Sequence, residues 1–220
     1  TNLGIVDDID GVADACTSAG VWLHIDGAYG GAAMAAPWVR HRFAGIQRAD
    51  SLVVDPHKWL FSPFDCAALV YADPSLARAA HTQHAGYLDP IIDDTVWNPC
   101  DYANVLTRRA RGMPFWFSLA VHGTRAYSEA VERTLEVTRA GAELVDAAPH
   151  LDLVLDPVLS VLAFRRIGWE QTDYDAWSAR LMEDGTAFVL PTQVDGEPAL
   201  RICIVNPLTT VDDIDMILDS

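Results

Sequence analysis

A carboxylate and an amine each follow a short apolar run in the first quarter of the chain. The run at residues 21–25 predicts a buried strand, and Asp26 stands at its C-terminal end. The run at residues 51–54 predicts a second strand, which is followed by His57 and Lys58. In an open parallel sheet, ligands bind outside the carboxyl ends of the strands. The sequence therefore predicts that Asp26 and Lys58 face the same site at the rim of a sheet.

An acid paired with a lysine fits the chemistry of pyridoxal 5'-phosphate. The aldehyde of this cofactor needs a lysine amine to form a Schiff base, and its pyridine nitrogen needs a carboxylate to stay protonated. Asp26 and Lys58 lie 32 positions apart, which leaves room for a crossover between two strands. The plain alternatives are a surface lysine after a strand and an aspartate that caps a turn.

Two motifs carry a resemblance to a known family. HIDGAYGG at 24–31 and DPHKW at 55–59 resemble the group II pyridoxal-phosphate-dependent decarboxylases, which include aromatic-amino-acid, glutamate and cysteine sulfinate decarboxylases. The resemblance implies an α/β chain of fold type I that decarboxylates an L-amino acid to its amine through a Schiff base on Lys58. It also implies that Asp26 holds the pyridinium nitrogen and that Ala28 lies under the cofactor ring.

The resemblance suggests further contacts with the cofactor. His57 corresponds to a family histidine near the cofactor or its phosphate, and we expect it to act in catalysis as well as in binding. Thr1 matches a family threonine that helps hold Asp26, and Ser51 is a candidate for lining the phosphate. Many family members carry asparagine where Asp55 stands. We leave Asp55 out of the phosphate site, because its carboxylate would repel a phosphate unless it faced away.

Two candidates concern the substrate. The stretch LRICIVNPLTTVDDID at 200–215 is similar to the last strand and helix of the family. In glutamate and cysteine sulfinate decarboxylases the arginine there holds the substrate's alpha-carboxylate, so the resemblance gives this role to Arg201. A planar guanidinium suits a carboxylate through paired hydrogen bonds. The family's proton donor is a tyrosine on a mobile loop. The irregular stretch 80–107 holds Tyr87 and Tyr102, but its spacing differs from the family's and neither tyrosine matches the donor, so the donor stays open. Tyr102 is kept as a candidate contact of the substrate.

The resemblance also divides the chain. Residues 1–112 correspond to the C-terminal part of a cofactor-binding large domain, residues 113–148 to a long connecting helix, and residues 149–220 to a small C-terminal α/β domain with a clipped end. Family members are substantially longer, so we expect a fragment that lacks the N-terminal half. The full-length family members are homodimers, and we expect the same of the complete protein.

Composition narrows the range of partners. The formal net charge of −16 argues against nucleic acid and against an anionic membrane surface. No apolar run approaches the roughly 20 residues that a membrane helix needs. The four cysteines form no CxxC motif, so we expect no metal site, no disulfide framework and a reducing cytoplasm.

Three alternatives stay open. A fold type I aminotransferase or lyase would use the same cofactor, and a catalytically incompetent remnant would use none. A metal hydrolase built on His24 and Asp26 is weaker, because we expect these two side chains to lie on opposite faces of the strand. The substrate is also open: DPHKW favours the aromatic branch of the family, whereas the C-terminal stretch 200–215 favours the glutamate and cysteine sulfinate branch.

Overall fold

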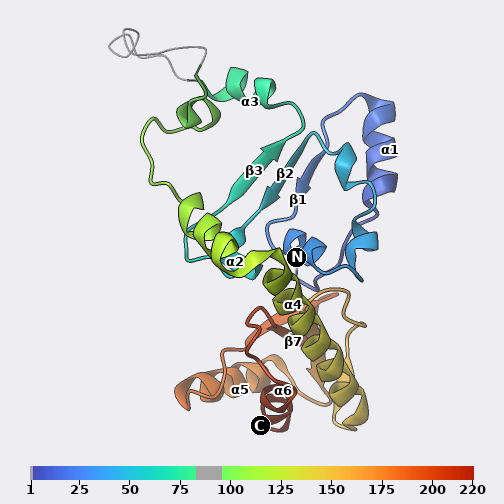
Figure 1. Cartoon of the computed structure of the whole chain (residues 1–220). Coiled ribbons are helices and arrows are strands. Elements are labelled where there is room, and N and C mark those ends of the chain that lie inside the picture. Colours follow the sequence, from blue (N-terminus) through green and yellow to red (C-terminus); the bar gives the residue numbers. More distant parts are fainter. Residues whose placement is uncertain (1, 83–95) are drawn as a thin grey trace.

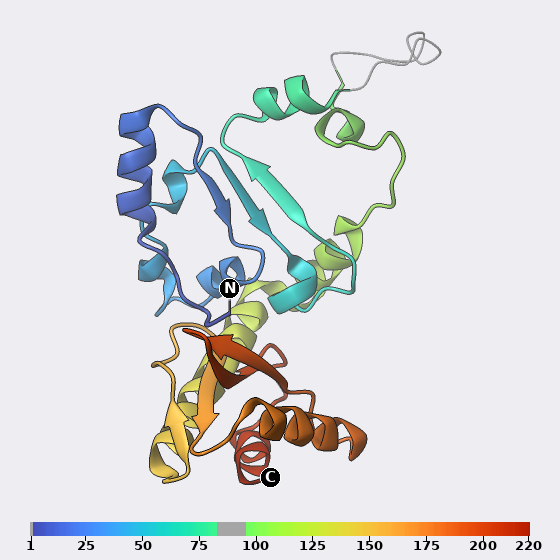
Figure 2. The same cartoon turned by 180° about the vertical axis from the view of Figure 1, so that it is seen from behind.

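Two sheets organise the computed structural model, which describes residues 2–82 and 96–220 (Figures 1 and 2). The first sheet has the order β1-β2-β3, with β1 at His24–Asp26, β2 at Ser51–Val54 and β3 at Ala68–Tyr71. β2 pairs parallel to β1 and antiparallel to β3. The strand predicted at 51–54 is confirmed. The apolar run at 66–71 predicts a further strand, either antiparallel to its neighbours or returning from the rim of the site, and the observed strand covers residues 68–71 and is antiparallel.

The first strand begins later than the sequence predicts. Val21 and Trp22 belong to the expected strand at 21–25, but both are exposed and lie outside β1. The N–H of Leu23 donates to the side chain of Asp50 at 2.7 Å instead of to a neighbouring strand. The strand therefore starts at His24 and includes Asp26, which pairs with Val53.

The helix α1 (Ile9–Ala19) stands beside β1 and has the ends that the sequence predicts (Figure 1). The Asp8 carboxylate accepts a hydrogen bond from the N–H of Gly11 at 3.1 Å and caps the first turn. Gly20 ends the helix in the left-handed conformation, with φ of 64°. Both signals lie within a few residues of the ends that they define.

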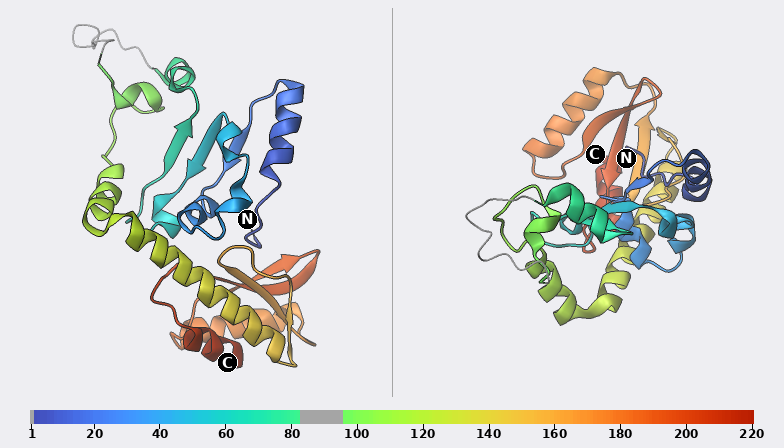
Figure 3. Two further views of the ribbon diagram at one scale, coloured as in Figure 1. Left: turned by 45° about the vertical axis from the view of Figure 1, so that its right-hand side comes forward. Right: turned by 90° about the horizontal axis from the view of Figure 1, so that it is seen from above.

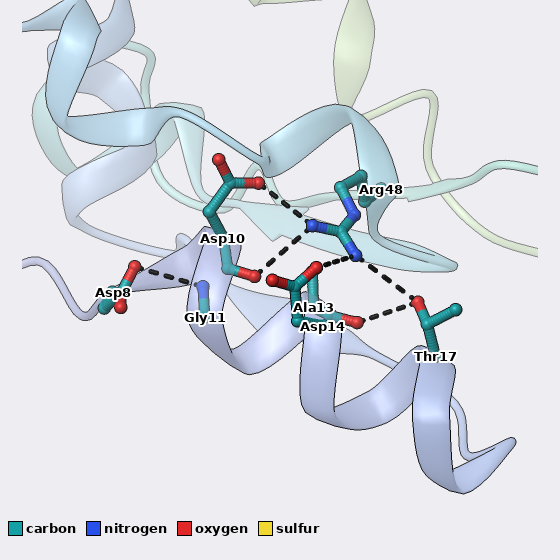
Figure 4. Close-up of polar contacts among 7 residues, drawn as sticks. All are labelled: Asp8, Asp10, Gly11, Ala13, Asp14, Thr17 and Arg48. Carbon is teal, nitrogen blue, oxygen red and sulfur yellow. Dashed lines mark hydrogen bonds and ion pairs between the residues drawn. The ribbon is translucent and has the colours of Figure 1, made fainter.

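A salt-bridged cluster holds α1 against the crossover that leads to β2 (Figure 4). The guanidinium of Arg48 contacts the Asp10 carboxylate at 3.1 Å and the Asp14 carboxylate at 2.7 Å. It also donates to the hydroxyl of Thr17. Near the same place, Gly45 has φ of 89°, and a Cβ on it would lie 2.9 Å from the backbone of Asp10. The crossover thus meets α1 through polar contacts and through close backbone contact.

The crossover between the two parallel strands is irregular, as the sequence predicts around residues 38–45. It consists of the short 3₁₀ helices η1 (Gly30–Ala35), η2 (Arg40–Phe43) and η3 (Ile46–Arg48). Three further short helices are absent from the sequence-based prediction: α2 (Pro56–Trp59), α3 (Pro74–His81) and the 3₁₀ helix η5 (Pro99–Tyr102). Each has proline in its first turn, where the missing N–H costs no hydrogen bond.

The long helix α4 (Gly112–Ala147) is broken in its first third. The sequence predicts one helix from about 114 to 147, but Gly123 has φ of 76° and ψ of 161°, which are not helical. A residue with a side chain rarely adopts such a positive φ, so glycine permits the bend. After the bend, α4 lies along the second sheet (Figure 3).

The second sheet is antiparallel throughout, with the order β4-β5-β7-β6. Its strands are β4 (Leu151–Leu153), β5 (Val161–Arg166), β6 (Leu190–Val194) and β7 (Glu197–Cys203). The dipeptide Asp195-Gly196 predicts a turn between two strands, and both residues have positive φ, as a type I′ hairpin requires. β4 is missing from the sequence-based prediction, because three residues are too few to show a pattern.

The helices α5 (Gln171–Glu183) and α6 (Val211–Asp219) pack with α4 and the second sheet around one core. Thr210 caps α6 as predicted, in a capping box with Asp213. A second core lies between the crossover, α2 and α4, where Trp59, Val131 and Leu135 are almost completely buried. α4 therefore supplies side chains to both cores. Among the described residues, none of the helices combines the length and the apolar character needed to cross a membrane.

Candidate functional site

The short helix α2 fixes Lys58 beside the turn that follows β1. The N–H of Asp55, just before α2, donates to the carbonyl of Ala28 at 3.1 Å, which joins the two motif segments. Trp59 is fully buried next to Lys58, and its indole N–H donates to the hydroxyl of Thr134 on α4 at 3.0 Å. The helix is thus held from both ends, while the Lys58 side chain stays 45% exposed.

Asp26 and Lys58 line one cavity of about 420 Å³, which we call the Asp26–Lys58 cavity. Ala28 also lines it. One oxygen of the Asp26 carboxylate accepts the N–H of Ala28 at 3.0 Å, and among the described residues the other oxygen accepts no hydrogen bond. The pyridine nitrogen of pyridoxal 5'-phosphate needs a carboxylate as its partner, and the aldehyde on the opposite side of the ring needs an amine. The residues present therefore fit the cofactor that the sequence predicts.

Two features of Lys58 are absent from the sequence-based prediction: an ion pair with Asp55, and the lack of any other lysine in the sequence. Its Nζ atom lies 2.8 Å from the Oδ2 atom of Asp55, whose side chain is 13% exposed. Lys58 is also the only lysine in the sequence: of the fifteen basic residues, fourteen are arginines. The second feature can be read from the sequence alone, because the one lysine in 220 residues lies inside the DPHKW motif.

His57 faces the loop that follows α2. Its Nδ1 atom lies 2.6 Å from the carbonyl oxygen of Cys66 and 3.0 Å from the nitrogen of the same residue. Its ring contacts Phe64 edge-on, with 4.8 Å between the centroids. His57 does not line the Asp26–Lys58 cavity, so these contacts hold the loop, and a contact with the cofactor stays a prediction.

Ser51 lies at the wrong end of its strand for the expected contact with a phosphate. It begins β2, whereas Lys58 follows the end of that strand. The Ser51 hydroxyl accepts the indole N–H of Trp22 at 2.9 Å and lies 2.7 Å from Nδ1 of His24. The side chain is almost completely buried in these contacts, so we withdraw Ser51 from the cofactor site.

The reason for setting aside a metal at His24 and Asp26 was wrong. Residues two apart on a strand share a face, and these two lie at the ends of the three-residue strand β1 and line the same cavity. The part of the chain that the structure describes has no group of three or more His, Cys, Asp or Glu residues that could hold a metal ion.

The two substrate candidates do not line the Asp26–Lys58 cavity. Arg201 lies on β7 opposite Ala163, and its Nε atom is buried without a hydrogen-bond partner among the described residues. Tyr102 ends η5 and stacks on Trp97, with 6.0 Å between the ring centroids. Thr1 lies outside the described residues, so its expected contact with Asp26 stays a prediction.

Tyr29, which the sequence-based prediction overlooked, joins the cavity to the second sheet. Its ring stacks on Trp59 with 5.0 Å between the centroids, and its hydroxyl lies 2.6 Å from the hydroxyl of Ser160. The N–H of Ser160 also donates to the Tyr29 hydroxyl at 3.1 Å. Burial raises the pKa of Tyr29 above its ordinary value, so the phenol stays protonated at neutral pH. Tyr29 belongs to the HIDGAYGG motif, but the sequence gives no signal for its contact with Ser160, which lies 131 positions away.

Replacing Tyr29 with phenylalanine is expected to lower the free energy of unfolding by about 1–2 kcal/mol. The change keeps the stacked ring but leaves the N–H and the hydroxyl of buried Ser160 without their partner. Chemical denaturation followed by fluorescence measures the difference. Tyr102→Phe is the matched control, because it removes a hydroxyl from a stacked ring without touching Ser160. Equal stability of the two variants would contradict the role of the Tyr29 hydroxyl.

A double ion pair holds the segment before α4 against the loop after α2. The Asp65 carboxylate contacts Arg109 at 2.9 Å and Arg111 at 2.8 Å, one through each oxygen. The hydrogen bond from Arg111 is the main cause that lowers the pKa of Asp65 below its ordinary value. The basic run at 108–111 therefore approaches the same loop that His57 contacts.

Comparisons with known proteins place the chain among decarboxylases. Residues 1–167 match the pyridoxal-dependent decarboxylase conserved domain. The chain is 31% identical to L-2,4-diaminobutyrate decarboxylase of Rhizobium meliloti (strain 1021) and 28% identical to aromatic-L-amino-acid decarboxylase of Bacillus atrophaeus. The alignments cover 100% and 97% of this chain, but 46% of each relative. The chain thus spans about half the length of the curated relatives that it matches.

Solved structures share the fold. Mouse CSAD matches with a TM-score of 0.89 and 26% identity, over 100% of this chain and 49% of that one. Oryza sativa TDC, solved with PLP and tryptamine, matches with a TM-score of 0.87 and 25% identity, over 97% and 46% of the two chains. The fold class that the sequence predicts, an α/β chain of fold type I, is confirmed.

Proposed function

This chain belongs to the pyridoxal-dependent decarboxylase family, and we propose that it decarboxylates an L-amino acid to its amine with pyridoxal 5'-phosphate. The observation that carries the proposal is the cavity shared by Asp26 and Lys58. These are the two residue types that the cofactor requires, and they stand in the two motifs that define the resemblance. Because the chain spans about half of its relatives, the proposal concerns the activity of the whole protein.

Each residue of the cavity has a proposed task. The Lys58 amine would hold the aldehyde carbon of the cofactor, and Asp26 would keep a proton at the pyridine nitrogen through the oxygen that accepts no hydrogen bond from the described residues. Ala28 offers a methyl group beside them, which leaves space for a flat ring. When bound, the cofactor supplies an electron sink for the pair released at the alpha carbon of the substrate.

Apolar side chains give the cavity a low-polarity wall. Ile25 and Leu52 line it from the first sheet, and Leu159 lines it from the segment before β5. Such a wall excludes water and strengthens the contact between a carboxylate and a protonated ring nitrogen. We therefore propose that water is excluded from the Asp26 carboxylate once a cofactor ring fills the cavity.

The substrate class stays at the level of an L-amino acid. The relatives named above act on aromatic amino acids and on L-2,4-diaminobutyrate, which differ in charge and size. We propose Arg201 as the residue that meets the substrate's alpha-carboxylate, supported by its Nε atom without a partner among the described residues. His57 is kept as a proposed contact of the cofactor, and Tyr102 as a proposed contact of the substrate.

We propose that the complete protein is a homodimer that uses the first part of α4 as an interface. Met113, Trp116, Phe117 and Val121 are exposed there by 46–75%. A contiguous exposed apolar surface of this kind marks an interaction site.

We propose a division of the chain at 1–112, 113–148 and 149–220. It is supported by the two cores, to both of which α4 supplies side chains.

We propose a reducing cytoplasm as the compartment, which the four free cysteines support.

The test measures products from a panel of amino acids in the presence of pyridoxal 5'-phosphate. Decarboxylation releases carbon dioxide and an amine, whereas an aminotransferase of the same fold would release a keto acid. Lys58→Arg is the control for cofactor-dependent turnover. Keto acid without carbon dioxide would overturn the proposal in favour of the aminotransferase. Absence of any cofactor absorbance band in the 220-residue chain would favour the catalytically incompetent remnant.

A further inference from the structure

Two short helices of this chain begin with the same dipeptide and use it differently. Asp55 and Pro56 begin α2, and Asp73 and Pro74 begin α3. The two aspartates have similar backbones, with φ and ψ of −105° and 94° at Asp55 and of −116° and 100° at Asp73. The Asp73 carboxylate caps its helix by accepting the N–H of Ser75 at 2.9 Å. This is the ordinary task of an aspartate at that position.

Asp55 does not cap α2 with its side chain. Its Oδ2 atom lies 2.8 Å from Nζ of Lys58 instead. The N–H of His57, which corresponds to the N–H of Ser75 in α3, donates to the carbonyl of Cys66 at 3.2 Å. The Asp55 side chain is 13% exposed, so a carboxylate largely removed from water has the lysine as its ion-pair partner. A buried carboxylate needs such a partner. The Asp55 carboxylate is thus left for the amine, and this ion pair is the observation that carries the inference.

We infer that Asp55 is a positioning residue for the Lys58 amine. This inference rests on the proposed function, because it assigns the ion pair to the resting form of the lysine that receives the cofactor. Asp55 is not among the residues that line the Asp26–Lys58 cavity, whereas Lys58 is. The ion pair therefore holds the amine at the boundary of the cavity, ready for an aldehyde that enters.

The surroundings of Lys58 make this anchor useful. The other titratable side chains that line the cavity are Asp7, His24, Asp26 and Tyr29. A lysine side chain has four rotatable bonds, and the amine could also turn toward the acids inside the cavity. The amine must form a C=N bond with the aldehyde carbon and release water, so its position relative to the carbonyl sets the rate. Asp55 reduces the number of positions that the amine occupies.

The experiment compares two reactions of the same amine in the 220-residue chain. In the cofactor-free protein, a small neutral acylating reagent labels Lys58 at a rate that mass spectrometry of the peptide containing residue 58 reports. The α-amino group of the same chain is the internal reference, because no other lysine competes. The second reaction is the addition of pyridoxal 5'-phosphate, followed by its absorbance and fixed by borohydride.

Asp55→Asn is expected to move the two rates in opposite directions. Acylation of Lys58 should become about threefold faster, because the amine is released from its ion pair. Addition of pyridoxal 5'-phosphate should become about tenfold slower, because the released amine is no longer held at the cavity. A variant that merely loosened the fold would accelerate acylation of every amine in the chain, including the internal reference. Asp73→Asn, at the matching helix start, should change neither rate.

The salt dependence of acylation supplies a second readout, which needs no cofactor. Between about 0.02 and 0.5 M salt, acylation of Lys58 in the unaltered chain should become about twofold faster, because salt screens an ion pair that reaches solvent. Asp55→Glu, which keeps the charge, should retain this salt dependence, and Asp55→Asn should lose it. Salt-independent acylation of the unaltered chain, or equal rates of cofactor addition with and without the Asp55 charge, would overturn the inference.

Failure of the proposed function gives a different result. If the unaltered chain forms no borohydride-stable adduct at Lys58, the decarboxylase proposal loses its support. The acylation rates and their salt dependence need no cofactor, so they still decide whether Asp55 holds the amine.

Discussion

Replacing Lys58 with arginine should abolish incorporation of the cofactor. Borohydride treatment of the unaltered chain with pyridoxal 5'-phosphate should fix about one pyridoxyl group per chain, on the only side chain with a primary amine. In Lys58→Arg the incorporation should fall to the background of the α-amino group. Arginine keeps the positive charge beside Asp55, so the ion pair and the local fold are preserved while the nucleophile is lost. Mass spectrometry of the reduced protein measures both the amount and the position.

Absence of other lysines makes this prediction easy to contradict. An adduct that persists undiminished in Lys58→Arg would lie on the α-amino group, and the assignment of Lys58 would be wrong. Thermal unfolding of the variant serves as the control for folding. Asp26→Asn is the companion variant: it should keep the adduct, because it leaves the amine intact, while weakening the binding of the ring.

Gly45→Ala should cause the largest loss of stability. Gly45 has φ of 89°, which costs a residue with a Cβ about 1–2 kcal/mol. The added Cβ would also lie 2.6 Å from the Asp10 carboxylate and 2.9 Å from the Asp10 backbone, and overpacking of this kind costs about 1–3 kcal/mol. The free energy of unfolding should fall by about 3 kcal/mol, and Tm should fall by roughly 6–12 °C for a chain of this size.

Gly20→Ala separates the two causes. Gly20 has φ of 64°, but a Cβ there would meet nothing within 4 Å. It should therefore lose only the conformational part, about 1 kcal/mol. Differential scanning calorimetry of both variants measures the gap. If Gly45→Ala is no less stable than Gly20→Ala, then the crossover does not meet α1 as closely as the distances at Gly45 indicate.

Local signals explain what the sequence made predictable. The ends of α1 depend on Asp8 and Gly20, which lie next to the helix, and β2 shows as an apolar run of its own. The pairing of Asp26 with Lys58 could be predicted because two motifs carry it. Such features involve residues that are close in the chain or fixed by a shared motif.

Contacts across long separations explain what the sequence did not show. The side chain of Asp50 takes the N–H of Leu23 and shortens β1, although these residues are 27 positions apart. Ser51 lies near the DPHKW motif in sequence, but four residues of extended chain carry it to the opposite end of β2. Gly123 has helical neighbours on both sides, so only the tertiary packing of α4 reveals its bend.

The burial of Trp59 turns the peptide bond after Lys58 into a reporter of local opening. A lysine-specific endoproteinase has one internal bond to cleave in this chain, and the residue on its far side is fully buried between Tyr29 and Thr134. Cleavage therefore requires local unfolding of α2, and the cleavage rate reports how often this opening occurs. We expect slow cleavage into two fragments of fixed size, and further protection when a ligand fills the neighbouring cavity.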